Sequence, residues 1–153
     1  MRPMSIFDEL IDVASAQGLT LGTAESLTGG LLAYSLSTSP GAGDVFIGAI
    51  VAYHRDVKYG LLQVPPGPVV NAETAATMAR SARHLLGCDA ALSLTGVAGP
   101  EPQDGMPVGT VFVAIDLGGD VDPRQFHFEG SPEEVRLAAT EAAARLLMEK
   151  LVG

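Results

Sequence analysis

Residues 24–30 read Ala-Glu-Ser-Leu-Thr-Gly-Gly and hold the residue types that nucleophilic chemistry needs. Ser26 stands where the chain leaves a predicted strand and enters a predicted helix, and Gly29 and Gly30 follow it closely. N–H groups at a helix start are unpaired and carry the positive end of the helix dipole, so they can hold a phosphate or a developing oxyanion. A serine nucleophile is one interpretation of this pattern. The alternative is that Ser26 or Thr28 only caps the helix and the glycines allow tight packing.

A lysine and a tyrosine that follow the next apolar stretch could assist such a serine. The chain has two lysines, Lys58 and Lys150, and Lys150 lies in the last turn of a predicted C-terminal helix, where it is solvated. Lys58 comes soon after the apolar residues 48–53, and a lysine kept neutral by burial can act as the general base for a serine. Tyr53 could donate a hydrogen bond at the same place. The alternative is a surface lysine beside a tyrosine at the rim of the sheet.

A glycine-rich turn and an arginine complete the set of candidate residues. Thr95, Gly96 and Gly99 belong to a Thr-Gly-Val-Ala-Gly-Pro segment directly after another short apolar strand. Turns of this kind cradle anions through their N–H groups, although the segment is neither a P-loop nor a dinucleotide fingerprint. Arg136 lies just inside the last predicted helix, either as an anion ligand or as a solvated partner of nearby glutamates. Three loops from three strand ends, each with hydroxyls or glycines, predict one pocket.

Short apolar strands that alternate with amphipathic helices must position these residues. Expected strands cover 19–24, 45–53, 90–94, 108–117 and 121–128, and expected helices cover 5–17, 27–36, 56–62, 72–86 and 132–151. The glycine pair at 118–119 predicts a hairpin, and a two-residue link joins only antiparallel strands. We therefore predict one domain over residues 1–153 with an α/β fold, a three-layer α/β/α arrangement. Its sheet is mixed and mostly parallel, with about five strands and one antiparallel strand.

Two details of this fold bear on the site. The stretch 45–53 is nearly all apolar, which predicts a strand covered on both faces. In mostly parallel sheets, ligands bind beyond the carboxyl ends of the parallel strands. The three candidate loops leave the expected strands at those ends, so we expect the chemistry there.

The composition excludes several classes of function. The 153 residues include 9 basic and 18 acidic side chains, for a formal net charge of −9. This balance argues against nucleic acids and anionic membranes as partners, because both need a basic face. A single cysteine, Cys88, and three scattered histidines predict no disulfide framework, no metal site and no cofactor. The chain has no apolar run of about 18 residues and no signal-peptide pattern, so we expect a cytoplasmic protein.

Four segments together resemble the signature of the CinA C-terminal-domain family, in the family's order and spacing over about residues 5–151. They are Thr-Ala-Glu-Ser-Leu-Thr-Gly-Gly at 23–30, residues 48–53 with Lys58, Thr-Gly-Val-Ala-Gly-Pro at 95–100 and Pro-Val-Gly-Thr-Val at 107–111. The family includes nicotinamide-nucleotide amidases, or NMN deamidases. The resemblance therefore implies hydrolysis of nicotinamide mononucleotide to nicotinate mononucleotide and ammonia in pyridine nucleotide salvage. It also implies the α/β/α fold, a homodimer or larger homo-oligomer, and the stand-alone form of a domain that follows another domain in longer relatives.

The resemblance further implies roles for single residues. Ser26 takes the place of the nucleophile, Lys58 that of its base and Tyr53 that of a catalytic tyrosine. The implied substrate-binding residues are Glu25, Thr28, Gly29, Gly30, Thr95, Gly96, Gly99 and Arg136. On this hypothesis Lys58 removes the Ser26 proton, and Ser26 attacks the carboxamide carbon. N–H groups at the start of the following helix hold the oxyanion, and water then cleaves the acyl-enzyme.

Four positions depart from the family's usual pattern. Leu27 replaces a common cysteine, and Arg55 stands at a usual asparagine. Met106 replaces a usual lysine and Pro132 a usual arginine, so two cations that could hold a phosphate are missing. A cation at Arg55 could lower the pKa of Lys58 or obstruct the pocket.

A second function is compatible with the same fold: a non-catalytic nucleotide-binding or interaction domain. The position of Lys58 discriminates between the two. A lysine shielded from water and close to Ser26 favours catalysis, whereas a lysine that points into solvent favours binding alone.

Overall fold

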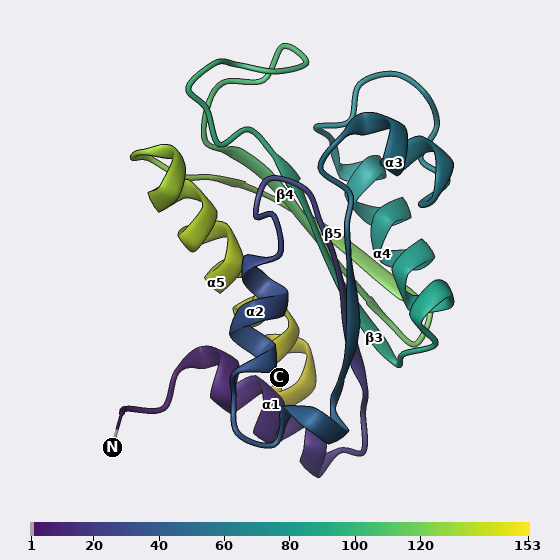
Figure 1. Cartoon of the computed structure of the whole chain (residues 1–153), viewed down its shortest axis with the longest axis vertical. Helices are drawn as coiled ribbons and strands as arrows, with labels where there is room; N and C mark the ends of the chain where they lie inside the picture. The colour runs from purple at the N-terminus through teal and green to yellow at the C-terminus, as the bar shows by residue number, and fades with distance from the viewer. Residues whose placement is uncertain (1) are drawn as a thin grey trace.

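A computed structural model describes residues 2–153 as one five-stranded sheet with helices on both faces (Figure 1). The strands are β1 (Leu21–Glu25), β2 (Phe46–Val51), β3 (Ala90–Gly96), β4 (Thr110–Leu117) and β5 (Asp120–His127). The helices are α1 (Ile6–Ala16), α2 (Leu31–Ser37), α3 (Arg55–Gly60), α4 (Ala72–Leu86) and α5 (Pro132–Val152), with a 3-10 turn, η1, at Ala42–Asp44. Helices α1, α2 and α5 lie on one side of the sheet, and α3 and α4 lie on the other (Figure 1).

The strand order β2-β1-β3-β4-β5 confirms the predicted mixed sheet. β1 pairs in parallel with β2 and with β3, whereas β4 is antiparallel to both of its neighbours. β4 is therefore the one strand that runs against the other four. The hairpin lies where the glycine pair predicts it, since Gly118 and Gly119 both have positive φ and join Leu117 to Asp120 across the turn.

Helix caps follow the sequence closely. Ser5 and Asp8 form a capping box at the start of α1, and Ser131 and Glu134 form another at the start of α5. The strands β1, β3 and β4 are buried along almost their whole length, because α4 covers one face of all three. On the other face, α5 packs on β3 and β4, and α2 packs on β1. This rigid centre fixes the ends of β1 and β3, where the candidate loops begin.

Two predictions about local structure are wrong. The helix expected from residue 27 begins at Leu31, because Gly29 and Gly30 adopt φ of +59° and +104° and make a turn. Gly30 is the N-cap and has no side chain that could cap the helix, so neither Ser26 nor Thr28 is the N-cap residue. β2 is an edge strand with Ile47 half exposed, not a strand covered on both faces, because the helices pack mainly over the central strands.

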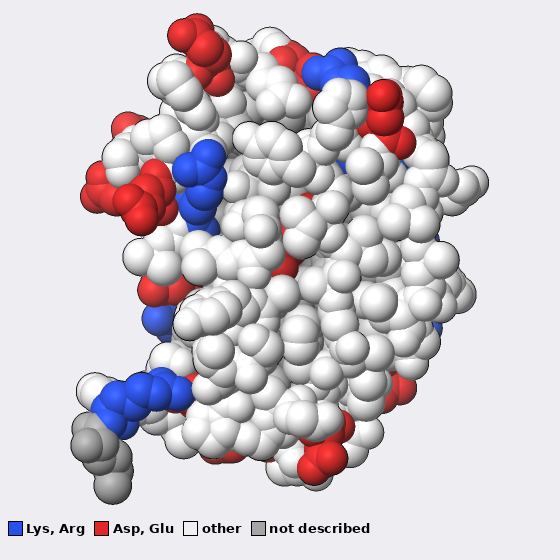
Figure 2. Space-filling model, viewed as in Figure 1, with Lys and Arg blue, Asp and Glu red and all other residues white. Residues whose placement is uncertain are grey.

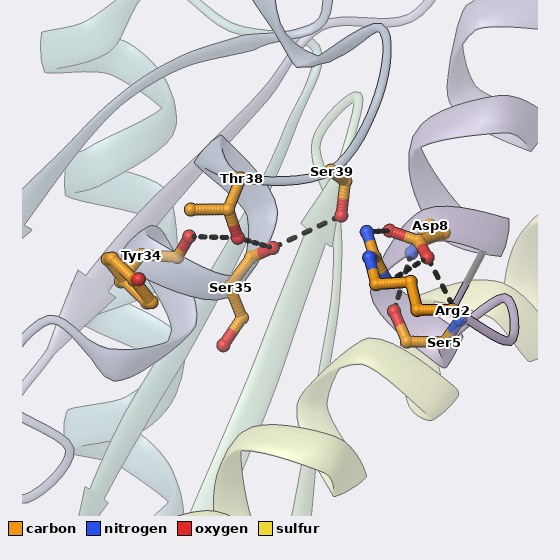
Figure 3. Close-up of polar contacts among 7 residues, drawn as sticks. All are labelled: Arg2, Ser5, Asp8, Tyr34, Ser35, Thr38 and Ser39. Atoms are coloured by element: carbon orange, nitrogen blue, oxygen red, sulfur yellow. Dashed lines mark hydrogen bonds and ion pairs between the residues drawn. The ribbon is translucent and has the colours of Figure 1, made fainter.

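Hydroxyl groups and one ion pair hold the chain around α1 and α2 (Figure 3). Arg2 donates two hydrogen bonds to Asp8, at 2.6 and 2.9 Å, and with the N–H of Ser5 it holds the pKa of Asp8 well below its usual range. At the end of α2, Thr38 and Ser39 donate to carbonyls of the last turn. Such bonds satisfy acceptors that a helix end leaves free. Within residues 2–153 no helix is both long enough and apolar enough to cross a membrane.

Candidate active site

A cavity of about 140 Å³ lies beyond the carboxyl ends of β1 and β3. Five segments form its wall: the turn after β1, the end of β2, α3, the end of β3 with its following loop, and the first turns of α5. The lining residues are Ser26, Leu27, Tyr53, Lys58, Thr95, Gly96, Val97, Ala98, Gly99, Glu101, Gln103 and Arg136. The structure thus brings together the three predicted catalytic residues and four of the predicted substrate-binding residues.

Ser26 is held by its backbone and has a free side chain. Its N–H donates to the carbonyl of Leu94 in β3 at 3.1 Å, and its own carbonyl accepts from Gly29 at 3.0 Å. Its hydroxyl forms no hydrogen bond within residues 2–153, and the N–H groups of Leu27 and Thr28 also find no partner there. A buried hydroxyl followed by two free N–H groups is an arrangement that suits attack on a carbonyl carbon.

Lys58 is buried, with only 2% of its surface exposed. Its Nζ donates to the carbonyl of Tyr53 at 3.3 Å. Burial and then the nearby charge of Arg55 lower the pKa of Lys58 to about 8, while Asp104 acts in the opposite direction. A substantial fraction of this amine is therefore neutral near pH 8 and can accept a proton.

The expectation that Arg55 lowers the pKa of Lys58 is confirmed, and Arg55 does not line the cavity. Lys58 is shielded from water, which meets one of the two conditions that favour catalysis over binding alone; the other is closeness to Ser26. Its amine makes no hydrogen bond to the Ser26 hydroxyl, although both residues line the same cavity. Catalytic hydrogen bonds are often long before substrate binds and shorten in the complex.

The end of β3 approaches its neighbours so closely that glycine is required. A Cβ at Gly96 would lie 2.6 Å from the carbonyl oxygen of Thr110, and one at Gly99 would lie 2.8 Å from the Val108 side chain. Beside them, the Thr95 hydroxyl donates to the carbonyl of Val69 at 2.7 Å, so its lone pairs stay available to a ligand.

Arg136 joins α5 to the turn that follows Ser26. Its Nε donates to the carbonyl of Leu27 at 3.0 Å. Among residues 2–153 its remaining guanidinium nitrogens make no hydrogen bond or ion pair. The alternative of a solvated partner for a nearby glutamate is therefore not what the structure has, and the free part of the guanidinium can bind an anion.

Four predicted substrate-binding residues do not reach the cavity: Glu25, Thr28, Gly29 and Gly30. Glu25 is fully buried, and its carboxylate accepts from the hydroxyls of Thr23 and Thr28. It also accepts from the N–H groups of Leu32 and Ala33, at 2.9 and 2.8 Å. Because the first free amides of α2 bind Glu25, the prediction that they hold an oxyanion is wrong. In the preceding turn, the available donor is the N–H group of Leu27, a residue that lines the cavity.

Sequence reasoning did not single out Leu27, Glu101 or Gln103 as site residues. Glu101 and Gln103 lie in the loop after the glycine-rich turn, and that closeness in sequence was the one signal that could have found them. Nothing in their residue types shows that this loop folds back over the cavity rather than out into solvent.

The profile of the CinA C-terminal domain family matches residues 4–151. The chain belongs to this family. A CinA-like protein from Geobacter metallireducens is 39% identical over 156 residues, which cover 95% of this chain and 38% of that protein. Another from Geotalea daltonii is 41% identical over 142 residues, which cover 89% of this chain and 34% of that protein. The chain therefore spans about a third of the length of the curated relatives it matches.

Solved structures of CinA proteins show the same fold over nearly the whole chain. A CinA superfamily protein from Klebsiella pneumoniae has a TM-score of 0.93 and 30% identity, over 99% of this chain and 98% of that one. A competence or damage-inducible protein from Enterobacter asburiae has a TM-score of 0.92 and 29% identity, over 95% of this chain and 96% of that one. The α/β fold of the CinA domain is thus established by relatives as well as by its own topology.

Proposed function

We propose that this CinA domain is an amidohydrolase that converts nicotinamide mononucleotide to nicotinate mononucleotide and ammonia. The observation that carries the proposal is the buried Lys58, with a pKa of about 8, in the same cavity as the unpartnered hydroxyl of Ser26. A neutral lysine amine can take the proton of a serine, and a Ser–Lys pair is a known variant of serine catalysis.

The reaction begins when the Lys58 amine removes the Ser26 proton and the Ser26 oxygen attacks the carboxamide carbon. The C=O π electrons move to oxygen, and the N–H group of Leu27 stabilises that oxyanion. The oxyanion then collapses, the C–N bond breaks, and the protonated Lys58 gives its proton to the leaving ammonia. Lys58 next removes a proton from water, and the hydroxide attacks the acyl carbon. The bond from that carbon to the Ser26 oxygen breaks, and Lys58 returns the proton to Ser26. Tyr53, which is two-thirds exposed at the cavity, is placed to donate to the leaving group.

Charges around the cavity suit a pyridine nucleotide. The free part of the Arg136 guanidinium is a ligand for the substrate phosphate, together with the N–H groups of Ala98 and Gly99, which have no partner within residues 2–153. Glu101 places a carboxylate on the cavity wall, which complements the positive charge of a nicotinamide ring attached to ribose. Met106 and Pro132, at positions where the family usually has cations, leave Arg136 as the main side-chain ligand for the phosphate.

The test is ammonia release from nicotinamide mononucleotide and from the same nucleoside without its phosphate. We expect the wild type to prefer the nucleotide. Arg136→Gln should raise KM for the nucleotide about tenfold or more and leave the phosphate-free nucleoside nearly unaffected, since a charge-assisted hydrogen bond contributes roughly 1.5–3 kcal/mol. If the folded wild type binds the nucleotide in calorimetry but releases no ammonia between pH 6 and 9, the domain is a binding module and the proposal fails.

We also propose that the CinA domain forms a homo-oligomer. The edge strand β2 and the neighbouring helices expose the apolar side chains Tyr34, Ile47, Val51 and Val57. Figure 2 shows a mostly uncharged surface over β2 and α2. Two copies that each carry a net charge of −9 would associate most readily through such a face. Ile47→Asp should convert an oligomer to a monomer in sedimentation experiments, and a monomeric wild type would contradict this proposal.

A further inference from the structure

Asp104 anchors the loop that closes one side of the cavity. Its Oδ2 accepts from the N–H groups of Val69 and Val70, at 2.8 and 3.3 Å. Only 11% of its side chain is exposed, and its backbone has a φ of +53°. Aspartate and asparagine tolerate this left-handed conformation better than most residues. Asp104 therefore connects the loop that holds Glu101 and Gln103 to the segment before α4.

The same carboxylate also meets the helix that carries the proposed base. Asp104 Oδ1 lies 4.0 Å from a guanidinium nitrogen of Arg55, which is the first residue of α3. Lys58 follows Arg55 by three residues, so the two share a face of that helix. Val69, whose N–H donates to Asp104, also accepts a hydrogen bond at its carbonyl from the hydroxyl of Thr95 at the end of β3. Asp104 thus connects three parts of the cavity wall.

We propose that Asp104 is a positioning residue, which holds the 101–106 loop against α3 and balances the charge of Arg55 beside Lys58. The inference rests on the proposed function in one respect, namely that Lys58 is the base.

Arg55 and Asp104 act on the pKa of Lys58 in opposite directions. The charged or titratable groups around Lys58 are Arg55 on its own helix, Asp104 from the loop, and Tyr53, Glu101 and Arg136 on the cavity wall. Of these, Arg55 lowers the pKa of Lys58 and Asp104 raises it. Removing either charge leaves the other uncompensated. Substitutions of Arg55 and of Asp104 must therefore shift the pKa of Lys58 in opposite directions.

Direct titration of Lys58 tests these opposite pKa shifts and needs no enzymatic activity. The protein is labelled with ¹³C-lysine, and the Cε signals are followed against pH by NMR. The chain has only two lysines, and Lys150, which pairs with Asp122 on the far side of the sheet from α3, serves as the internal reference. Asp104→Asn removes the charge but keeps an oxygen acceptor and tolerates the backbone conformation. Arg55→Gln removes the opposing charge, and the exposed Arg145→Gln on α5 is the matched control.

We expect Asp104→Asn to lower the Lys58 titration midpoint by roughly half to one pH unit and Arg55→Gln to raise it by a similar amount. The double variant should return close to the wild-type midpoint, and Arg145→Gln should change nothing. An unmoved midpoint in Asp104→Asn, or shifts of the same sign in both single variants, would overturn the charge balance. Arg55 is about half exposed, so Arg55→Gln decides the question even if Asp104→Asn folds poorly.

The anchoring half of the proposal has its own test. Asp104→Ala should speed hydrogen exchange at the Val69 and Val70 amides at least tenfold, whereas Asp104→Asn should leave it close to wild type. Unchanged exchange in Asp104→Ala would overturn the anchor. In the amidase assay, the midpoint of kcat/KM against pH should move with the Lys58 titration. If the titration moves and the activity profile does not, Lys58 is not the base, and that result contradicts the proposed function rather than the charge balance.

Discussion

Replacing Glu25 by glutamine should destabilise the fold by roughly 2–5 kcal/mol, because both carboxylate oxygens are fully used. One oxygen accepts from Thr28 and from the Leu32 N–H, and the other accepts from Thr23 and from the Ala33 N–H. A glutamine must point its NH₂ at one of these two N–H groups, whichever way it turns. The threonine hydroxyls can rotate to accept, but a backbone N–H cannot.

The magnitude follows from two losses. One buried N–H without an acceptor costs about 1–3 kcal/mol. The lost charge at the start of α2 costs about 1–2 kcal/mol more in a buried site. For a chain of 153 residues, such a change lowers Tm by roughly 5–15 °C. The matched control is Glu73→Gln, an exposed acidic residue in the first turn of α4, where we expect less than about 0.5 kcal/mol.

The assay is urea unfolding followed by circular dichroism, with ammonia release measured on the same samples below the transition. A stable Glu25→Gln variant that has lost its substrate affinity would refute this reasoning, because Glu25 would then act on the substrate directly. A destabilised variant that keeps a near-wild-type KM would support the purely structural role.

Two further predictions concern the cavity wall. Lys58→Met should abolish activity yet stabilise the fold at pH 7 by roughly 3 kcal/mol, because a folded pKa of about 8 lies below the unfolded value near 10.5. The unfolded state binds the extra proton between those values, so wild-type stability should rise with pH from 8 to 10.5, and denaturation at several pH values checks this. Gly96→Ala should cost roughly 1–3 kcal/mol by forcing β3 from β4, whereas Gly43→Ala, with open space around its Cβ, should cost far less in the same measurement.

Much of the fold follows from local signals in the sequence. The capping boxes at Ser5 and Ser131 and the glycine pair at 118–119 each specify a local conformation, and the structure has all of them. The start of α2 was missed because the apolar pattern begins at Leu27. Two successive glycines with positive φ override that pattern and delay the helix to Leu31. The exposure of β2 depends on its place at the sheet edge, which no local pattern reveals.

In the candidate site, too, some residues can be predicted from the local sequence, whereas others depend on contacts between distant segments. Ser26, Lys58 and Arg136 could be proposed from residue type and position after strands or at a helix start. The hydrogen bonds from the α2 amides to the Glu25 carboxylate could not be proposed in this way. They cross a turn whose shape no local pattern in the sequence indicates. The contact between Asp104 and the N–H of Val69 joins residues 35 apart in the chain, so no pattern in the sequence points to it.

In the proposed mechanism, the Ser26 hydroxyl forms the acyl-enzyme. Its most direct test is the rate of ammonia release from nicotinamide mononucleotide by the Ser26→Ala variant. The matched control is Ser35→Ala on α2, whose hydroxyl only bonds the carbonyl of Leu31. We predict that Ser26→Ala lowers kcat by roughly 10³-fold or more, while Ser35→Ala stays within a few-fold of wild type. Ammonia release by Ser26→Ala within tenfold of the wild-type rate would contradict the account.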